Sequence, residues 1–370
     1  MAGKPLHKTF DKSVVYDSDN STSGDRVKLY VNGVRETSFA TDTNPSQNQK
    51  IHALENSKVH YWGSYGGAPT NSAYALDGLM SHINFIDGTQ AAPTVFGSTD
   101  SVTGEWKIST SPSVTYGNNG YFILKDGNSV TDQSGNSNNF TVGNGTLTNT
   151  EDCPSNVFAT LNPLYQQTTG EGVVLMNGNT RCYYNPDSSR SAFGTIAVGT
   201  GKYYYEAECE TAGTGPVVGV VDLAWGGING AAGAFHDNAL NFGYNVSGQK
   251  TSGGVNTAYG SAISDNDILG CAMDLDNGKL YFSLNGSWQG SGDPTSGSTG
   301  TGSAFNLASG ANYTAACRLR NGTICEFNFG NGYFGTTQIS SEGTNASGIG
   351  KFEYDVPTGY TALSTKGLNE

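Results

Sequence analysis

Charged side chains are scarce in this sequence, and basic ones most of all. Only 14% of the 370 residues are charged, against roughly 25% in ordinary globular domains. Lysine and arginine together number 19, the net charge is −13, and no basic run occurs. Because phosphate contacts need clustered lysine and arginine, the composition argues against nucleic acid and against an anionic membrane surface as partners.

Long apolar runs are missing as well. No run approaches the roughly 18 residues that a transmembrane helix needs. The first residues, "MAGKPLHKTFDKS", are polar and lack the apolar stretch of a secretory signal. We therefore expect a protein that stays in the cytoplasm of the cell that makes it, or leaves it by lysis.

Proline is sparse and helical periodicity is absent, whereas glycine and aromatic residues are abundant. There are 11 prolines and 52 glycines, and aromatic residues make up 11% of the chain. Alternating apolar and polar runs separated by Gly, Asn, Ser and Thr are typical of strands and turns. The sequence therefore predicts an all-β fold rather than a helical or disordered chain.

Two alternating runs repeat one phrase. "KLYFSLNG" occupies residues 279–286 and "KLYVNG" occupies residues 28–33. In the second run Leu29 and Val31 share one face of the expected strand. Both runs end in Asn-Gly, the strongest short-range hairpin signal, so each predicts a half-buried strand followed by a tight turn.

The six cysteines are expected to be free thiols. The Asn-Gly pair at 321–322 predicts a two-residue hairpin, which would put Cys317 and Cys325 on opposite faces and prevent a bond between them. Cys209 and Cys271 fall at apolar positions of strand-like runs, as small core residues do. Free thiols fit a protein that folds in a reducing compartment.

Composition divides the chain into four segments. Residues 1–92 are expected to form a first β-module, and residues 93–165 an irregular connector. Residues 166–335 are expected to form a second, complete β-module, and residues 336–370 a C-terminal tail. Within the second module, the low-complexity run at 291–304 predicts an exposed loop.

The second module carries six phrases in a familiar order. They are "GKYYYEAE", "VVGVVDLAW", "NFGYNVSGQK", "SDNDILGCAMDLDNGKLYFSLNG", "YTAACRL" and "CEFNFG". In this order they resemble a SPRY domain, with Phe242 in place of the usual tryptophan. The resemblance implies a bent β-sandwich of the concanavalin-like group.

The first module resembles the C-terminal half of a laminin-G-like, concanavalin-like jelly roll. The phrases that carry this resemblance are "VVYDSDNSTSGDRVKLYVNGV" and "YALDGLMSHINFIDG". Only 27 residues precede its Lys-Leu-Tyr, so half of the expected strands are missing. Three interpretations stay open: another chain donates strands, the remnant packs on the rest of this chain, or it is loosely ordered.

The order of the modules resembles structural proteins of tailed bacteriophages, particularly marine ones. "TVFGSTDSVTGEWK", "NGYFILKD", "DQSGNSNNFTV", "NVFATLNPL" and the closing "PTGYTALSTKGL" contribute to this resemblance. It implies a non-enzymatic protein on the virion surface, either a capsid-decorating knob or a tail-fibre appendage. The implied partners are other virion structural proteins, in a homo- or hetero-oligomer, and host-surface glycan.

Two sets of residues are candidates for contact with partners. The incomplete first module predicts an assembly surface, because a sandwich without half its strands exposes an apolar face. Loop aromatics of the second module predict a surface for glycan or protein, unless the two tryptophans are core residues. The assembly set is Tyr16, Leu29, Val31, Tyr61 and Trp62, and the loop set is Trp225, Phe235, His236, Tyr244 and Trp288.

One acidic run is the candidate for catalysis. Glu206, Glu208 and Glu210 alternate along one strand and so share a face. Some concanavalin-like glycoside hydrolases carry a similar run, and paired carboxyls can cleave a glycosidic bond. The alternative is the solvated face of a strand whose Tyr203, Tyr205, Ala207 and Cys209 face the core. A glycan-active hydrolase is therefore the second hypothesis, and an intracellular SPRY adaptor, which fits the acidic composition less well, is the third. No nucleophile motif supports another kind of catalysis.

Metal and cofactor signals are weak. No Cys-x₂₋₄-Cys pair occurs, so zinc is not expected. Laminin-G-like modules can bind calcium, and two polar runs offer oxygen ligands, although Asx turns explain the same residues. The calcium candidates are Asp17, Asp19, Asn20 and Asp25 in the first run, and Asp132, Asn136 and Asn138 in the second.

Overall fold

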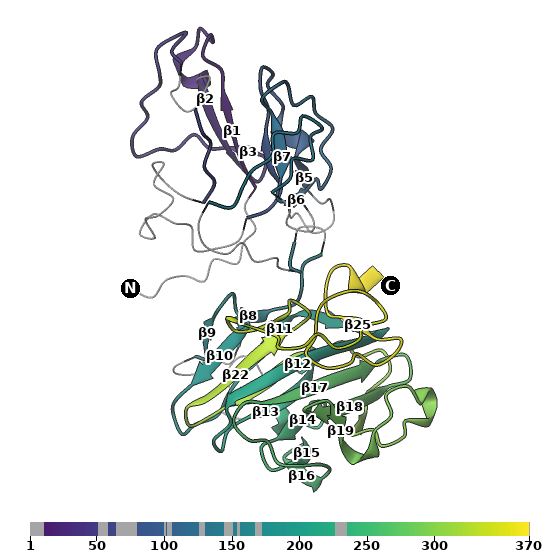
Figure 1. Ribbon diagram of the computed structural model, residues 1–370. Helices are drawn as coiled ribbons and strands as arrows, with labels where there is room; N and C mark the ends of the chain where they lie inside the picture. Colours follow the sequence, from purple (N-terminus) through teal and green to yellow (C-terminus); the bar gives the residue numbers. More distant parts are fainter. Residues whose placement is uncertain are drawn as a thin grey trace. The chain divides into compact units, whose positions relative to one another are not determined.

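The computed structural model describes residues 11–50, 58–63, 80–99, 101, 106–125, 130–143, 151–153, 156–166, 172–225 and 235–369. In these ranges the chain forms strands and short 3-10 turns (Figure 1), which confirms the all-β expectation. None of the helices in these ranges has the length and hydropathy that crossing a bilayer requires. The 3-10 turns are η1 (Ser23–Asp25), η4 (Pro93–Val95), η5 (Phe235–Asp237), η6 (Gln289–Ser291), η7 (Gly297–Thr299) and η8 (Gly367–Asn369).

Two compact units, rather than the four expected segments, divide the described chain. The first unit is Lys8–Ser155 and the second contains Asn156–Glu370. Most of the expected connector belongs to the first unit, because its strand β7 (Tyr121–Ile123) pairs with β4 (Ile83–Phe85). The expected C-terminal tail belongs to the second unit.

The second unit is a sandwich of two large sheets. Its main apolar core draws residues from both sheets. The nine-stranded sheet runs β19 (Ser287–Trp288), β18 (Lys279–Leu284), β17 (Asp267–Asp274), β12 (Lys202–Thr211), β22 (Thr323–Asn328), β10 (Arg181–Tyr184), β9 (Val174–Met176), with β20 (Phe305–Asn306) beside β18 and β25 (Thr361–Ala362) beside β12. The seven-stranded sheet runs β16 (Val255–Ala258), β15 (Gln249–Ser252), β14 (Phe242–Asn245), β13 (Val217–Asp222), β21 (Tyr313–Leu319), β11 (Arg190–Val198), β8 (Leu161–Gln166), and a separate hairpin pairs β23 (Tyr333–Phe334) with β24 (Thr337–Gln338).

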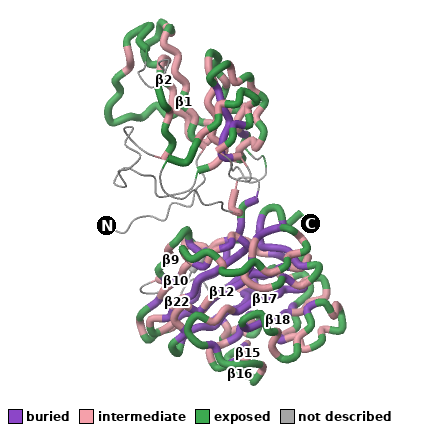
Figure 2. Tube along the Cα trace, viewed as in Figure 1, coloured by how far each residue is buried: buried purple, intermediate pink, exposed green. Residues whose placement is uncertain are grey.

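Strand β12 is buried on both of its faces. Tyr205 points into the sandwich, where its hydroxyl donates to the carbonyl of Gly219 at 2.6 Å. Tyr204 points the other way and is equally buried, as the purple tube of β12 shows in Figure 2. Something must therefore cover the outer face of the nine-stranded sheet.

The C-terminal segment, residues 336–370, is that cover. Phe352 is fully buried, with its ring 5.1 Å from that of Tyr204. Further along, Thr361 pairs with Tyr203, so that β25 runs parallel to β12. Figure 1 shows this segment in yellow above the nine-stranded sheet. Residues 336–370 are thus part of the folded unit, not a free tail.

The first unit has no large sandwich in its described part. Its small core gathers Tyr121, Ile123 and Leu124 around the β4–β7 pair. The β1–β2–β3 sheet has no buried residue, and its labelled strands in Figure 2 carry no purple. The three sheets are β1 (Lys12–Tyr16), β2 (Val27–Val31) and β3 (Val34–Arg35); β4 with β7; and β5 (Gly97–Thr99) with β6 (Trp106–Ile108).

The Asn-Gly turns form as expected, but one of them does not make a hairpin. Both residues have positive φ at 32–33, 285–286 and 321–322, as a tight two-residue turn requires. The first two turns join paired strands. The third joins β21 to β22, which lie in different sheets, so the expected pairing of Cys317 with Glu326 was wrong. All six cysteines are free, as predicted.

The role of the C-terminal segment can be tested with Phe352→Ala. Because the ring is fully buried against Tyr204, its loss is expected to lower the free energy of unfolding by about 3–5 kcal/mol in urea denaturation. The control is Leu368→Ala, since Leu368 lies in the same segment but is 43% exposed. Equal, negligible effects of both substitutions would mean that the segment does not pack on the sheet.

Candidate functional site

Glu206 is the carboxylate that fixes the C-terminal segment to β12. Its side chain is fully buried. The backbone N–H groups of Glu353 and Tyr354 each donate to it at 2.9 Å. The Tyr204 hydroxyl at 3.1 Å and the Asn328 amide at 3.2 Å complete its partners. The expectation that Glu206 stands on a solvated face was wrong, because the C-terminal segment covers that face.

Burial raises the pKa of Glu206 to about 7, and its four hydrogen-bond donors oppose that rise. A raised carboxyl pKa is a property of general acids, but a general acid must also reach its substrate. Glu206 is fully buried and already holds two backbone amides. Its geometry therefore serves to hold the backbone in place.

The other two acidic residues of the run have separate surroundings. Arg181 binds Glu210 at 2.8 Å and Glu326 at 2.7 Å. Glu208 lies opposite Glu326 in the strand register, and burial followed by repulsion from Glu326 raises its pKa. Alternation along β12 was predicted correctly: Glu206 is fully buried, whereas Glu208 and Glu210 are partly exposed on the same face. Glycan cleavage by this run stays a hypothesis.

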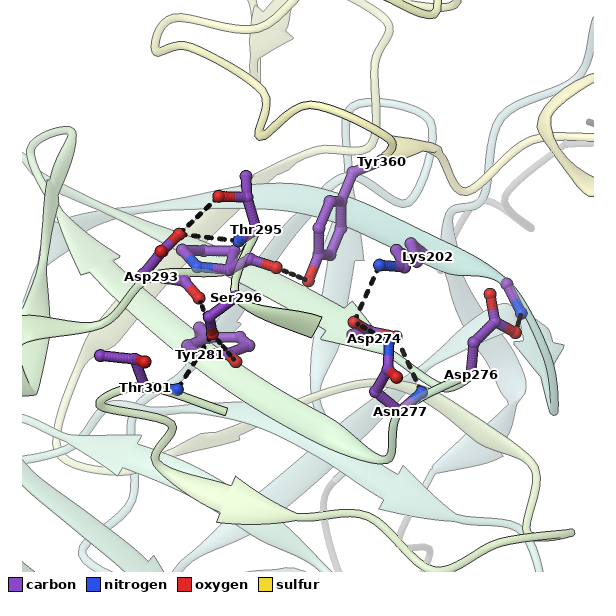
Figure 3. Close-up of polar contacts among 12 residues, drawn as sticks. Lys202, Asp274, Asp276, Asn277, Tyr281, Asp293, Thr295, Ser296, Thr301 and Tyr360 are labelled. Carbon is purple, nitrogen blue, oxygen red and sulfur yellow. Dashed lines mark hydrogen bonds and ion pairs between the residues drawn. The ribbon is translucent and has the colours of Figure 1, made fainter. Parts of the chain in front are cut away.

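A second polar cluster ties the C-terminal segment to the end of the nine-stranded sheet. Figure 3 shows Lys202 with its ammonium 3.0 Å from Asp274, which is fully buried. The same ammonium lies 5.8 Å from the centre of the Tyr360 ring, and the Tyr360 hydroxyl donates to the Pro294 carbonyl at 3.0 Å. These contacts join β12, β17, a loop and the C-terminal segment.

The loop at 291–304 is more structured than its composition predicted. The Thr295 N–H donates to the Asp293 carboxylate at 2.9 Å, and the Thr301 N–H donates to the Ser296 hydroxyl at 2.9 Å (Figure 3). Although Asp293 and Thr295 are exposed, Pro294 is buried. The Ser/Thr/Gly composition here builds side-chain-to-backbone turns.

The loop aromatics of the second unit do not form one exposed surface. Phe235 and Tyr244 are fully buried, which contradicts the expectation that they are open to a partner. Trp225 packs edge-on against Phe193, with ring centres 5.9 Å apart. Trp288 lies against the main core, 6.4 Å from the ring of Tyr204. The alternative, that both tryptophans pack on core residues, fits these contacts.

His236 lies in the same 3-10 turn as Phe235, on the outer face of the seven-stranded sheet. Its side chain is only 12% exposed, and burial lowers its pKa to about 4. Trp225 and Phe235 cover this face together with Phe193. Residues 226–234 of this loop lie outside the described residues. Glycan attachment through these side chains stays a prediction.

The calcium candidates split into separate hydrogen-bonded groups. Asn20 donates to Asp17 at 2.9 Å, whereas Asp25 pairs with Arg35 at 2.7 Å. Asp19 is exposed. In the described ranges, no three His, Cys, Asp or Glu side chains are grouped so as to hold a metal ion. Calcium binding to oxygen ligands of other types stays a prediction.

The second polar run forms a loop held by its own side chains. Asp132 accepts hydrogen bonds from the N–H groups of Phe122, Ser134 and Asn138 at 2.8–2.9 Å, and these bonds lower its pKa against the effect of burial. The Asn136 and Asn138 amides donate to the Gly120 carbonyl at 2.9 Å. Asx-turn chemistry accounts for these residues.

The β1–β2–β3 sheet presents one apolar face. Val14 lies opposite Leu29, Tyr16 opposite Val27, and Val31 pairs with both Lys12 and Val34, so these side chains share a face. Three of them are well exposed: Val14 at 66%, Val27 at 39% and Val34 at 71%. We call Val14, Tyr16, Val27, Leu29, Val31 and Val34 the N-terminal apolar face.

The predicted assembly set falls into two places. Tyr16, Leu29 and Val31 belong to the N-terminal apolar face. Trp62 instead donates from its indole to the Tyr121 hydroxyl at 2.9 Å, next to the small core around β7. Tyr61 and Trp62 are 45% and 47% exposed. Residues 74–79, the start of the expected closing strand, lie outside the described residues.

The comparisons with known proteins concern the second unit. The SPRY domain family model matches residues 202–332. These residues form a SPRY domain. The matched range is shorter than the expected 166–335, yet β8 to β11 precede it and belong to the same two sheets.

Two relatives illustrate the likeness. The ATP-dependent RNA helicase DDX1 of Xenopus laevis is 29% identical over 139 residues, which are 37% of this chain and 16% of the helicase. The crystal structure of the SPRY domain of human HERC1 matches with 15% identity and a TM-score of 0.35, covering 45% of this chain and 96% of that one. Neither relative points to a bacteriophage particle, and the likeness to a laminin-G-like module also stays a prediction.

The sequence analysis did not predict the residues that cover the outer face of β12 in the SPRY domain. Phe352, Glu353 and Tyr354 lie in the segment that was expected to be a tail. The sequence does contain bulky apolar residues in this segment, Phe352, Val356 and Tyr360, all of which are buried. They favour a packed segment over an exposed tail, but they do not say what it packs on.

The SPRY domain should become less stable as the pH rises through the pKa of Glu206. Its folded pKa of about 7 lies above the ordinary 4.5, so between these values the folded state holds a proton that the unfolded chain has lost. This contribution, at most about 3 kcal/mol, is full below pH 4.5 and lost by pH 7.

The measurement is urea unfolding between pH 4.5 and 7.5 for the wild type and for Glu206→Gln, which cannot titrate. The difference between the two free energies should change across this window. Glu342→Gln is the control, since Glu342 is 53% exposed and pairs with Lys351 at 3.8 Å. Parallel curves for the wild type and Glu206→Gln would contradict the assignment.

Proposed function

We propose that this chain is a non-enzymatic assembly protein on the surface of a bacteriophage particle, as a capsid-decorating knob or a tail-fibre appendage. The observation that carries the proposal is the N-terminal apolar face, whose Val14 and Val34 are 66% and 71% exposed. A sheet of three short strands without a buried residue gains little stability alone. Contiguous exposed apolar surface of this kind marks a protein contact.

The occupant of the N-terminal apolar face is a second copy of this chain. The chain carries a net charge of −13, so most pairs of its surfaces would repel each other. The six residues of the face carry no charge; Lys12 shares their register, and Glu36 lies at its edge, where its N–H donates to the Leu29 carbonyl at 2.8 Å. In an antiparallel contact between two copies, Lys12 of one copy can meet Glu36 of the other, and symmetric contacts between identical chains are the commonest kind of oligomer.

The SPRY domain supports a structural role. Its fully buried carboxylate Glu206 holds the backbone of residues 353–354, and Glu210 is paired with Arg181. These groups are used to hold the fold together. The bacteriophage assignment itself rests on the ordered resemblance described for the sequence, which runs through both units.

Self-association can be tested by sedimentation velocity over a concentration series. The wild-type chain should form oligomers, and Val14→Asp with Val34→Asp should give monomers, because both side chains are exposed in the monomer and would be desolvated in the contact. The matched control is Val255→Asp, since Val255 is also on a strand and is 64% exposed. Monomeric wild type at every concentration would contradict the proposed contact.

The particle assignment has its own test. The chain is labelled in purified particles of the virus that encodes it and imaged by electron microscopy. Label on the outer surface of the head or tail is the expected result. Purified particles without the chain would contradict the assignment, whatever its oligomeric state.

A further inference from the structure

Five of the six cysteines lie in the interior of the SPRY-containing unit. Cys182, Cys209, Cys271, Cys317 and Cys325 are all fully buried in its main core. A lone buried cysteine is an ordinary small core residue. These thiols are instead gathered, and one pair bridges the two sheets.

Cys182 and Cys317 form that pair. Cys182 lies on β10 of the nine-stranded sheet, and Cys317 lies on β21 of the seven-stranded sheet. Their sulfur atoms are 3.4 Å apart, and the residues are 135 positions apart in the chain. A disulfide needs about 2.05 Å, so the two sulfurs must approach by about 1.4 Å in total.

The position of the pair is one that β-sandwiches can bridge. Immunoglobulin domains carry a disulfide between their two sheets, which shows that the spacing of packed sheets permits the bond. Cys182 also lies opposite Cys325 in the strand register, but that bond would link neighbouring strands of one sheet. Of these two bonds, only Cys182–Cys317 would join the two sheets.

We propose that Cys182 and Cys317 are an oxidation site, at which a peroxide converts the two thiols into a disulfide that locks the two sheets together. One thiolate attacks hydrogen peroxide, giving a sulfenic acid and, after protonation, water. The second thiol then attacks that sulfur, forming the S–S bond and releasing a second water. Two S–H bonds and one O–O bond are broken, and both sulfurs are oxidised.

The reaction is slow in the closed sandwich. Burial raises the pKa of Cys182 well above its ordinary value, so the reactive thiolate is rare. Peroxide must also enter an interior from which water is excluded, which requires local opening of the sheets. The bond is therefore expected to form only after prolonged exposure to oxidant, when the protein has left a reducing compartment.

The test exposes the full chain to hydrogen peroxide a few degrees below its unfolding transition. Denatured protein should then contain two fewer titratable thiols than the six of the reduced chain, and digestion without reductant should give a Cys182–Cys317 peptide. Closing so long a loop should raise the midpoint of thermal unfolding by about 5–10 °C, reversibly on reduction.

Two variants separate the bond from general oxidation. Cys317→Ala should lose the shift between oxidised and reduced samples, whereas Cys271→Ala should keep it, because Cys271 lies on β17, opposite Tyr205 of β12, and is not a member of the pair. Comparing each variant with its own reduced form removes any cost of the substitution. Six surviving thiols, a bond from Cys182 to Cys325, or oxidation of single thiols alone would overturn the proposal.

Discussion

The fold of the second unit depends on covering the outer face of its nine-stranded sheet. Strand β12 carries large side chains on both faces, and Tyr204 and Tyr205 are equally buried. The sandwich core accounts for one face only. The C-terminal segment covers the other, and it is held by the hydrogen bonds between Glu206 and the backbone of residues 353–354. A buried carboxyl group with four hydrogen-bond donors fixes the position of the segment, because any shift would leave buried polar groups without partners.

In the first unit, no described segment buries the apolar face of the β1–β2–β3 sheet. Its β1–β2–β3 sheet exposes apolar side chains that a complete sandwich would bury. The described part of the second unit therefore buries both faces of its nine-stranded sheet at β12, whereas the β1–β2–β3 sheet of the first unit leaves its apolar face exposed. This contrast is the basis for the proposal that an assembly contact uses the N-terminal apolar face.

Local patterns in the sequence predicted local structure well. The Asn-Gly pairs at 32–33 and 285–286 are tight hairpin turns, and alternation along β12 sorted Tyr205 from Glu206 correctly. Contacts between residues far apart in the chain could not be predicted, because no local sequence pattern specifies which distant segment a strand will meet. Glu206 meets Glu353 across 147 positions, and the turn at 321–322 crosses between sheets because β21 and β22 each pair with other strands. The prediction that Phe235 is open to a partner was wrong for the same reason, since its burial depends on residues of distant strands.

The packing of the C-terminal segment on β12 can be measured by hydrogen–deuterium exchange of two amides. The N–H groups of Glu353 and Tyr354 donate to a fully buried carboxylate, so they can exchange only when the C-terminal segment detaches. These two amides should be protected from exchange as strongly as the β12 amides. Exchange at the rate of an unstructured peptide, while β12 remains protected, would contradict it.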